Sequence, residues 1–189
     1  MKKYKFFLFI FLAWLCILSA CDDADTIPVN HQTSFFNVGN YWQYENGEEV
    51  KIDTTISING LTYYRQVTNY DTTYMRIEDG KIYQGNPDGF ESLKFNINAR
   101  EGSNWSFQYS EDDNYIYNVT LVESNKTLVV NDHRFQNCKI FYFDIPEFAD
   151  EESLIWVSPY YGVIATQSVA WGGINELDLV IIDDQLLDL

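Results

Sequence analysis

Five carboxylates that lie near aromatic residues are the first candidates for chemistry in this sequence. They are Glu91, Glu101, Asp144, Glu147 and Glu176. A glycoside hydrolase needs two carboxyl groups roughly 5 to 10 Å apart, and a sequence does not give that distance. The chain has 28 acidic residues in all. Solvated charges on strand edges and loops are therefore the simpler interpretation of these five.

Nucleophilic and metal chemistry have few residues to use. The two histidines, His31 and His133, do not have the spacing of a metal-binding pair. Cys138 has Phe135 and Phe141 as apolar neighbours, so we expect a small buried hydrophobic residue rather than a reactive thiol. The sequence has no nucleophile elbow, phosphate-binding loop or dinucleotide fingerprint. We therefore expect a protein that is not an enzyme and that carries no cofactor.

Acidic loops and aromatic rings are the candidates for binding. Calcium takes about six to eight oxygen ligands, and one acidic loop could supply several, although a solvated hairpin tip is the simpler interpretation. The residues of that loop are Glu111, Asp112, Asp113 and Asn114. Aromatic rings stack on sugars and anchor protein interfaces. The candidate ligand-binding rings are Tyr160, Tyr161 and Trp171, and two glycines after Trp171 would present it on a loop. Packing in the core is the simpler interpretation of any single ring.

Antiparallel strands would have to position these side chains. Residues 51–58 and 115–121 alternate between apolar and polar positions, which is typical of strands with one face on a core. Asn59-Gly60 is a hairpin signal, and turn signals recur every 8 to 12 residues or so. Aromatic residues make up 17% of the chain and favour strands. The sequence predicts an all-β fold, in which a single antiparallel meander forms a curved sheet, a half-barrel or a barrel.

A short pattern occurs twice. Residues 39–44 and 102–107 share the pattern Gly-x-x-Trp-x-aromatic, and residues 55–63 resemble residues 127–135 in the same order. This order indicates a duplicated strand-hairpin unit, with repeats at 36–97 and 98–170. Chance similarity between strands is the alternative.

The first twenty residues are typical of a secretory signal. Three lysines precede an apolar run at residues 6–17, which is shorter than the roughly 20 residues of a spanning helix. The sequence LSAC at residues 18–21 resembles the bacterial lipobox, in which the cysteine becomes the first mature residue and carries lipid such as palmitate. We therefore expect the chain to be cut before Cys21 and anchored to a membrane through lipid on that cysteine.

The mature chain would have a tether and one domain. Residues 21–31 are acidic and contain a proline, which is typical of a flexible tether, and residues 32–189 would form the all-β domain. Residues 1–20 hold three of the 12 basic residues and none of the 28 acidic ones, so the mature formal charge is −19. Such a charge repels phosphate backbones and argues against nucleic-acid binding.

The motifs resemble those of uncharacterised secreted lipoproteins common in Bacteroidota. The matching residues are Gly39, Trp42 and Tyr44, then Gly102 and Trp105, and finally the stretch from Trp156 to Ile164. The resemblance covers residues 36–182 and implies an envelope lipoprotein built on a curved antiparallel sheet, sometimes a half-barrel with a hydrophobic lining. It carries no activity.

The location within the envelope has two interpretations. Asp22 directly after the cysteine resembles an inner-membrane retention signal, whereas an acidic stretch there also resembles the surface-export signal of Bacteroidota lipoproteins. The chain is rich in Asn, Tyr, Ile and Asp, as the AT-rich genomes of Bacteroidota tend to encode. This composition favours the second interpretation and hence the outer membrane, on the periplasmic or the surface side.

Two functions follow as hypotheses. The preferred one is a non-catalytic binding or interaction module that contacts an envelope protein or a glycan through exposed aromatic rings. It predicts no deep cavity and an exposed apolar patch beyond the few hundred Å² that are usual for a monomer. The alternative is a carrier of a hydrophobic ligand in the curved sheet, or a carbohydrate-binding protein. A carrier predicts an enclosed apolar cavity of some hundreds of Å³.

Overall fold

A computed structural model describes residues 35–189, so the signal, the tether with Cys21, and His31 lie outside the described residues. Between residues 35 and 189 the chain forms thirteen strands and no helix, which confirms the all-β prediction. The strands are β1 (Tyr41–Tyr44), β2 (Glu49–Ile58), β3 (Leu61–Thr68), β4 (Thr72–Glu78), β5 (Lys81–Gly85), β6 (Glu91–Asn96), β7 (Asn104–Phe107), β8 (Tyr117–Val130), β9 (His133–Asp144), β10 (Ser153–Ser158), β11 (Gly162–Ser168), β12 (Ile174–Ile182) and β13 (Gln185–Asp188). The described residues include no helix that could cross a membrane.

Two-residue turns join several of the strands, as their sequences predict. Asn59 and Gly60 connect β2 to β3 with φ angles of 52° and 81°. Asn131 and Asp132 connect β8 to β9 with φ angles of 45° and 68°. Two successive positive φ angles match the twist of the flanking strands, which is why asparagine, aspartate and glycine occupy these positions. These turns keep sequential strands antiparallel and adjacent.

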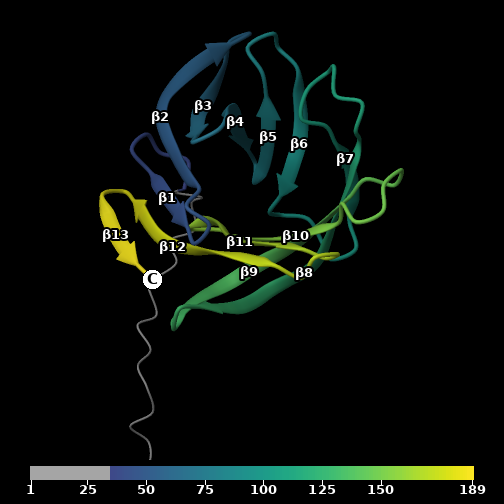
Figure 1. The fold of residues 1–189 in the computed structure, drawn as a ribbon. Coiled ribbons are helices and arrows are strands. Elements are labelled where there is room, and N and C mark those ends of the chain that lie inside the picture. Colours follow the sequence, from purple (N-terminus) through teal and green to yellow (C-terminus); the bar gives the residue numbers. More distant parts are fainter. Residues whose placement is uncertain (1–34) are drawn as a thin grey trace, which may run out of the picture. The chain divides into compact units, whose positions relative to one another are not determined.

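The strands form one antiparallel meander whose first and last members meet. From β1 to β6, and again from β7 to β12, each strand pairs with the next strand in the chain. β12 then returns to β1, where Val180 lies opposite Trp42, and β13 folds back on β12. Twelve strands therefore surround a common interior, and Figure 1 shows them as a nearly closed barrel.

A seam remains between β6 and β7. These two strands follow one another in the chain and lie side by side, but in the described residues no backbone ladder joins them. The backbone amide of Gln108, just after β7, instead donates to the Ser92 hydroxyl oxygen of β6 at 3.0 Å. A hydrogen bond from a backbone amide to a side chain thus joins the two segments where the ladder is absent.

The repeated glycine motif adopts the same local structure in both places. The Gly39 amide donates to the Ile52 carbonyl at 2.8 Å, and the Gly102 amide donates to the Leu121 carbonyl at 2.8 Å. Both glycines have positive φ, at 103° and 82°. The two proposed repeats therefore begin with an identical turn into β1 and into β7, while duplication itself stays a prediction.

The interior is filled on one side only. Phenylalanines of β6 to β9 pack against one another, with ring centroids 5.0 Å apart for Phe95 and Phe141 and 6.1 Å apart for Phe107 and Phe143. Beside Met75, three inward positions of β3 and β4 hold smaller or polar side chains, namely Gln66, Thr68 and Thr73. Because a barrel of more than about eight strands encloses more space than one layer of side chains fills, this side is left open.

Candidate ligand-binding site

A cavity of about 440 Å³ occupies the open side of the barrel. Its walls come from β1 to β6 on one side and from β10 to β12 on the other. The apolar lining includes Trp42, Val50, Ile52, Met75, Ile82, Phe95, Ile155 and Val157. This volume lies within the range of about 300 to 1,000 Å³ that small-molecule sites occupy. The cavity is therefore large enough to hold a ligand.

The mouth of the cavity lies at the end of the barrel where β1 and β3 finish. Glu48 of the β1–β2 turn lines it, together with Tyr70 and Asp71 of the β3–β4 loop. Tyr70 is 82% exposed, and Asp71 is exposed as well. Solvent therefore reaches the cavity past an acidic rim.

The opposite end of the cavity is closed by two aromatic rings. Phe35 and Phe36 precede β1, line the cavity and are each 6% exposed. Phe35 lies against Gly162 at the start of β11, where an added Cβ would come within 3.2 Å of its ring. Gly162 also has a φ angle of 80°, which L side chains rarely adopt. A glycine is thus needed for this ring to close the floor.

One basic side chain lines the cavity, and a β-bulge positions it. Leu93 pairs with Tyr83 and Phe95 pairs with Ile82, so Lys94 is the extra residue of β6. A bulge places two neighbouring residues opposite one partner and re-aims their side chains. Lys94 and Phe95 consequently share the inner face with Ile82.

The Lys94 ammonium has an unusual set of neighbours. It donates to the Gln84 side-chain oxygen at 2.9 Å, and it lies 5.7 Å from the ring centroid of Phe107 and 5.4 Å from that of Tyr109. Burial lowers the pKa of Lys94 to about 8, although the negative charge of Glu48 acts in the opposite direction. The side chain is half-buried and lines the cavity. At neutral pH the Lys94 side chain is therefore mostly protonated, and its positive charge lies among aromatic rings.

Two phenols of the cavity wall stay neutral. Burial raises the pKa of Tyr109 to about 12, with smaller contributions from Tyr117 and Asp113. Burial also raises the pKa of Tyr44 well above its usual value, and the Tyr44 hydroxyl donates to the Val163 carbonyl at 2.9 Å. Neither hydroxyl can act as a base near neutral pH.

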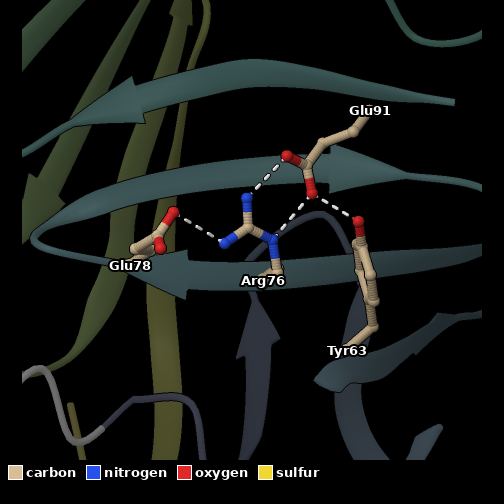
Figure 2. A network of polar contacts seen from close by, with 4 residues as sticks. All are labelled: Tyr63, Arg76, Glu78 and Glu91. Carbon is tan, nitrogen blue, oxygen red and sulfur yellow. Dashed lines mark hydrogen bonds and ion pairs between the residues drawn. The ribbon is translucent and has the colours of Figure 1, made fainter. Parts of the chain in front are cut away.

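A second polar cluster lies on the outer face of β3 to β6 (Figure 2). Arg76 follows the cavity-lining Met75, so alternation directs it outward. Its guanidinium donates twice to the Glu91 carboxylate, at 2.7 and 2.6 Å, and once to Glu78 at 3.0 Å. The Tyr63 hydroxyl donates to the same Glu91 carboxylate. The cluster links β3, β4 and β6.

This outer cluster has the properties of a structural brace. The bidentate contact with Arg76 holds the pKa of Glu91 below its usual value despite partial burial. A glycosidase acid needs the opposite, a raised pKa. An added Cβ at Gly85, in β5, would lie 2.8 Å from the Phe90 carbonyl oxygen and 3.0 Å from the Tyr63 ring, so glycine leaves room there for both groups. Glu91 therefore has the properties of a residue that holds strands together rather than of one that transfers a proton.

The remaining candidate carboxylates lie on separate elements. Glu101, before β7, accepts from the Ser124 amide at 2.7 Å and from its hydroxyl at 2.9 Å, and these bonds lower its pKa. Glu176 lies in β12, where burial and a neighbouring glutamate raise its pKa. Asp144 ends β9, and Glu147 is exposed in the loop after it. The structure gives these residues no common cleft.

The three predicted ligand-binding rings do not form one surface. Trp171 is 78% exposed in the β11–β12 loop. Tyr160 and Tyr161 precede β11, where they pack against the core, with their ring centroids 4.7 Å apart. The seven residues of β11 separate the two places, a distance of about 20 Å at the usual strand rise. None of the three lines the cavity.

The predicted calcium loop does not gather its carboxylates. In residues 35–189 no three acidic, histidine or cysteine side chains lie close enough together to hold a metal ion. Asp113 instead accepts from the Tyr115 amide at 3.0 Å, while Glu111, Asp112 and Asn114 are exposed. The geometry gives the calcium prediction no support.

Cys138 and His133 take structural positions. Cys138 is fully buried, and burial raises the pKa of its thiol to about 11, which confirms the expected apolar environment. His133 begins β9, and its Nδ1 is buried without a hydrogen-bond partner. Neither residue lines the cavity.

Lys94 and Gln84, the polar residues that distinguish the cavity wall, were not among the sequence candidates. No local pattern marks them, because the bulge that directs Lys94 inward depends on its partner strand. Comparison with family models, curated proteins and solved structures finds no match for this chain.

Proposed function

We propose that this protein is a lipid-anchored envelope protein that carries a small hydrophobic ligand inside its barrel. The observation that supports this proposal is the cavity of about 440 Å³ with a mainly apolar lining. The carrier hypothesis predicts such a cavity, whereas the interaction hypothesis predicts no deep cavity. The anchor on Cys21, the outer membrane and the absence of catalysis belong to the same proposal and rest on the sequence.

Both ends of the cavity suit this role. The floor is sealed by Phe35 and Phe36, so a bound chain would be shielded from water there. The mouth is open at Tyr70 and Asp71, which gives a ligand one route in. An apolar ligand gains about 25 cal/mol for each Å² of apolar surface that it removes from water. The apolar lining around the cavity supplies such surface.

Native mass spectrometry of residues 23–189, which include every described strand, tests the proposal. We expect either a copurified hydrophobic molecule or uptake of the neutral probe N-phenylnaphthylamine by the stripped protein. Thr73→Phe places a ring inside the cavity, since Thr73 lines it, and is expected to abolish both signals.

Thr72→Phe is the matched control. Thr72 is the exposed neighbour on β4, so its ring stays outside the barrel and uptake is expected to persist. A bare mass together with no probe uptake by the wild type would overturn the carrier proposal. Equal uptake by Thr73→Phe would place the probe elsewhere and overturn it too.

The interaction module is kept as a second candidate because of one loop. Val169, Trp171 and Ile174, at the β11–β12 connection, are 48%, 78% and 51% exposed. Exposed aromatic residues are frequent anchors of protein and glycan interfaces. In-cell cross-linking tests this candidate, because Trp171→Ser should remove a specific cross-linked partner without changing probe uptake. An unchanged cross-linking pattern would argue against this loop as an interface.

A further inference from the structure

The cavity contains a cation, Lys94, that forms no ion pair within residues 35–189, and Glu48 at the mouth acts on it only through its charge. The ion pairs of residues 35–189 join Arg65 to Asp53, Arg76 to two glutamates and Lys126 to Glu123, and Lys94 takes part in none of them. An ammonium has three donor hydrogens, and within the described part of the chain only the Gln84 side-chain oxygen accepts one from Lys94.

A charge in such a place lowers stability unless something pairs with it. Taking an ammonium out of water costs several kcal/mol even after relaxation, and aromatic faces replace only part of that hydration. The rings near Lys94 are those of Phe95, Phe107 and Tyr109, at 5.9, 5.7 and 5.4 Å from the ammonium. A hydrophobic residue at this position would avoid the cost.

We propose that the cavity holds a single-chain anionic amphiphile whose head group binds Lys94 and Gln84 and whose chain lies against the apolar wall. This inference rests on the carrier function proposed above and adds the ligand class to it. The Gln84 side-chain amide has no acceptor among the described residues, and Gln84 lines the cavity beside Lys94. Two donor groups thus stand together on one wall, as a carboxylate or phosphate head group requires.

The surroundings of Lys94 favour a chain over a small anion. Glu48 and Asp71 at the mouth repel any anion that approaches. A small anion would gain only the contact with Lys94, whereas an amphiphile also buries its chain against Trp42 and Met75. The hydrophobic gain then offsets the repulsion at the rim.

The volume favours one chain over two. If each non-hydrogen atom takes about 30 Å³, the share of one water molecule in the liquid, a cavity of about 440 Å³ holds on the order of fifteen atoms. A saturated chain of medium length with one head group fits this number. A lipid with two long chains has several times this number of atoms.

A series of ligands with the same chain and different head groups tests the inference. Isothermal titration calorimetry of stripped residues 23–189 would compare dodecanoate, dodecyl phosphate, dodecanol and dodecylammonium. We expect one or both anions to bind at least about tenfold more tightly than dodecanol, and the cation to bind least. The relative affinities of dodecanoate and dodecyl phosphate identify the head group.

Two lysine variants complete the test. Lys94→Met is expected to bind dodecanoate and dodecanol equally. Lys81→Met removes the same charge from an exposed position of β5 and should keep the preference for the anion. Circular dichroism confirms that both variants fold.

The outcomes separate the two proposals. If no amphiphile binds the wild type, the carrier function itself fails. If all four bind with equal affinity, or if Lys94→Met keeps the preference for the anion, the carrier function stands and the head-group inference is overturned.

Discussion

Replacing Lys94 by methionine is expected to stabilise the ligand-free protein. Methionine keeps the length of the side chain and removes its charge, so the aromatic contacts of the position are retained. Most core substitutions destabilise a protein. A gain in stability would therefore be a specific sign that the native side chain serves something other than folding.

The size of the gain follows from two opposing contributions. The pKa of Lys94 falls from 10.5 to about 8, and one pKa unit corresponds to about 1.4 kcal/mol. The buried charge therefore costs the folded state about 3 kcal/mol. Removing the ammonium also leaves the Gln84 oxygen without its donor, a loss of about 1 to 2 kcal/mol. The net stabilisation at pH 7 is then about 1 to 2 kcal/mol.

The pH dependence has a definite sign. Below about pH 8 both the folded and the unfolded chain keep the proton on Lys94, so the cost is present in full. Between about pH 8 and 10.5 the folded chain releases this proton and the unfolded chain keeps it. Wild-type stability must therefore rise relative to Lys94→Met across this range. Above it the cost of the charge is gone.

Urea unfolding followed by tryptophan fluorescence at pH 7 and pH 10 measures both effects. The variant should be the more stable protein at pH 7, and its advantage should vanish or reverse at pH 10. Lys81→Met, on the exposed face of β5, should show neither change. A Lys94→Met protein that is less stable at pH 7, or a difference that does not depend on pH, would refute the description of Lys94 as a partly buried cation without an ion-pair partner.

Three further changes test other parts of the fold. Gly162→Ala should cost about 2 kcal/mol or more because its φ is 80° and its Cβ would lie 3.2 Å from a phenyl ring. Gly102→Ala, with a φ of 82° and open space around it, should cost only about 1 kcal/mol. Equal losses of melting temperature in the two variants would contradict the contact between Gly162 and the Phe35 ring. Glu91→Gln should cost about 2 to 3 kcal/mol because Arg76 loses an anionic partner. The contribution of Glu91 is lost as pH falls through its lowered pKa, so wild type and variant should converge in acid. Cys138, with its pKa raised to about 11, should react with iodoacetamide only after unfolding, and labelling of the native protein would disprove its burial.

The local parts of this fold could be predicted from the sequence. Residues 51–58 alternate and lie in β2, and Asn59 and Gly60 make the turn that follows. Such signals depend on neighbouring residues alone, so a sequence displays them directly. Tyr115 and Ile116 show the limit, because they belong to an alternating stretch but are exposed before β8 begins at Tyr117.

The closure of the barrel could not be predicted in the same way. It depends on β1 pairing with β12, where Tyr41 lies opposite Ile181. No local pattern encodes a contact between residues so far apart in the chain. The sequence therefore left a curved sheet, a half-barrel and a barrel as alternatives, and only the assembled strands distinguish them.

The candidate site depended on an irregularity that alternation conceals. Leu93 and Phe95 would share the inner face in a regular strand, which would direct Lys94 outward to solvent. The bulge reverses this arrangement and places Lys94 inside with Phe95. The glycines after Trp171 indicated an exposed ring, whereas core packing was the simpler interpretation of any single ring. Trp171 is exposed, and it lies apart from the cavity.

The polar residues inside the barrel are the strongest reason to regard the cavity as a binding site rather than a packing defect. The chain fills the side between β6 and β9 with phenylalanines, so it has the means to build a tight core. At the border of this packing, on β5 and β6, it places Gln84 and Lys94, which cost stability when they are dehydrated. Residues that lower stability without a structural return are typical of functional sites. Lys94→Met should therefore raise the stability of the protein and weaken its binding of an anionic ligand. A cavity that is only a packing defect would not require these opposite effects.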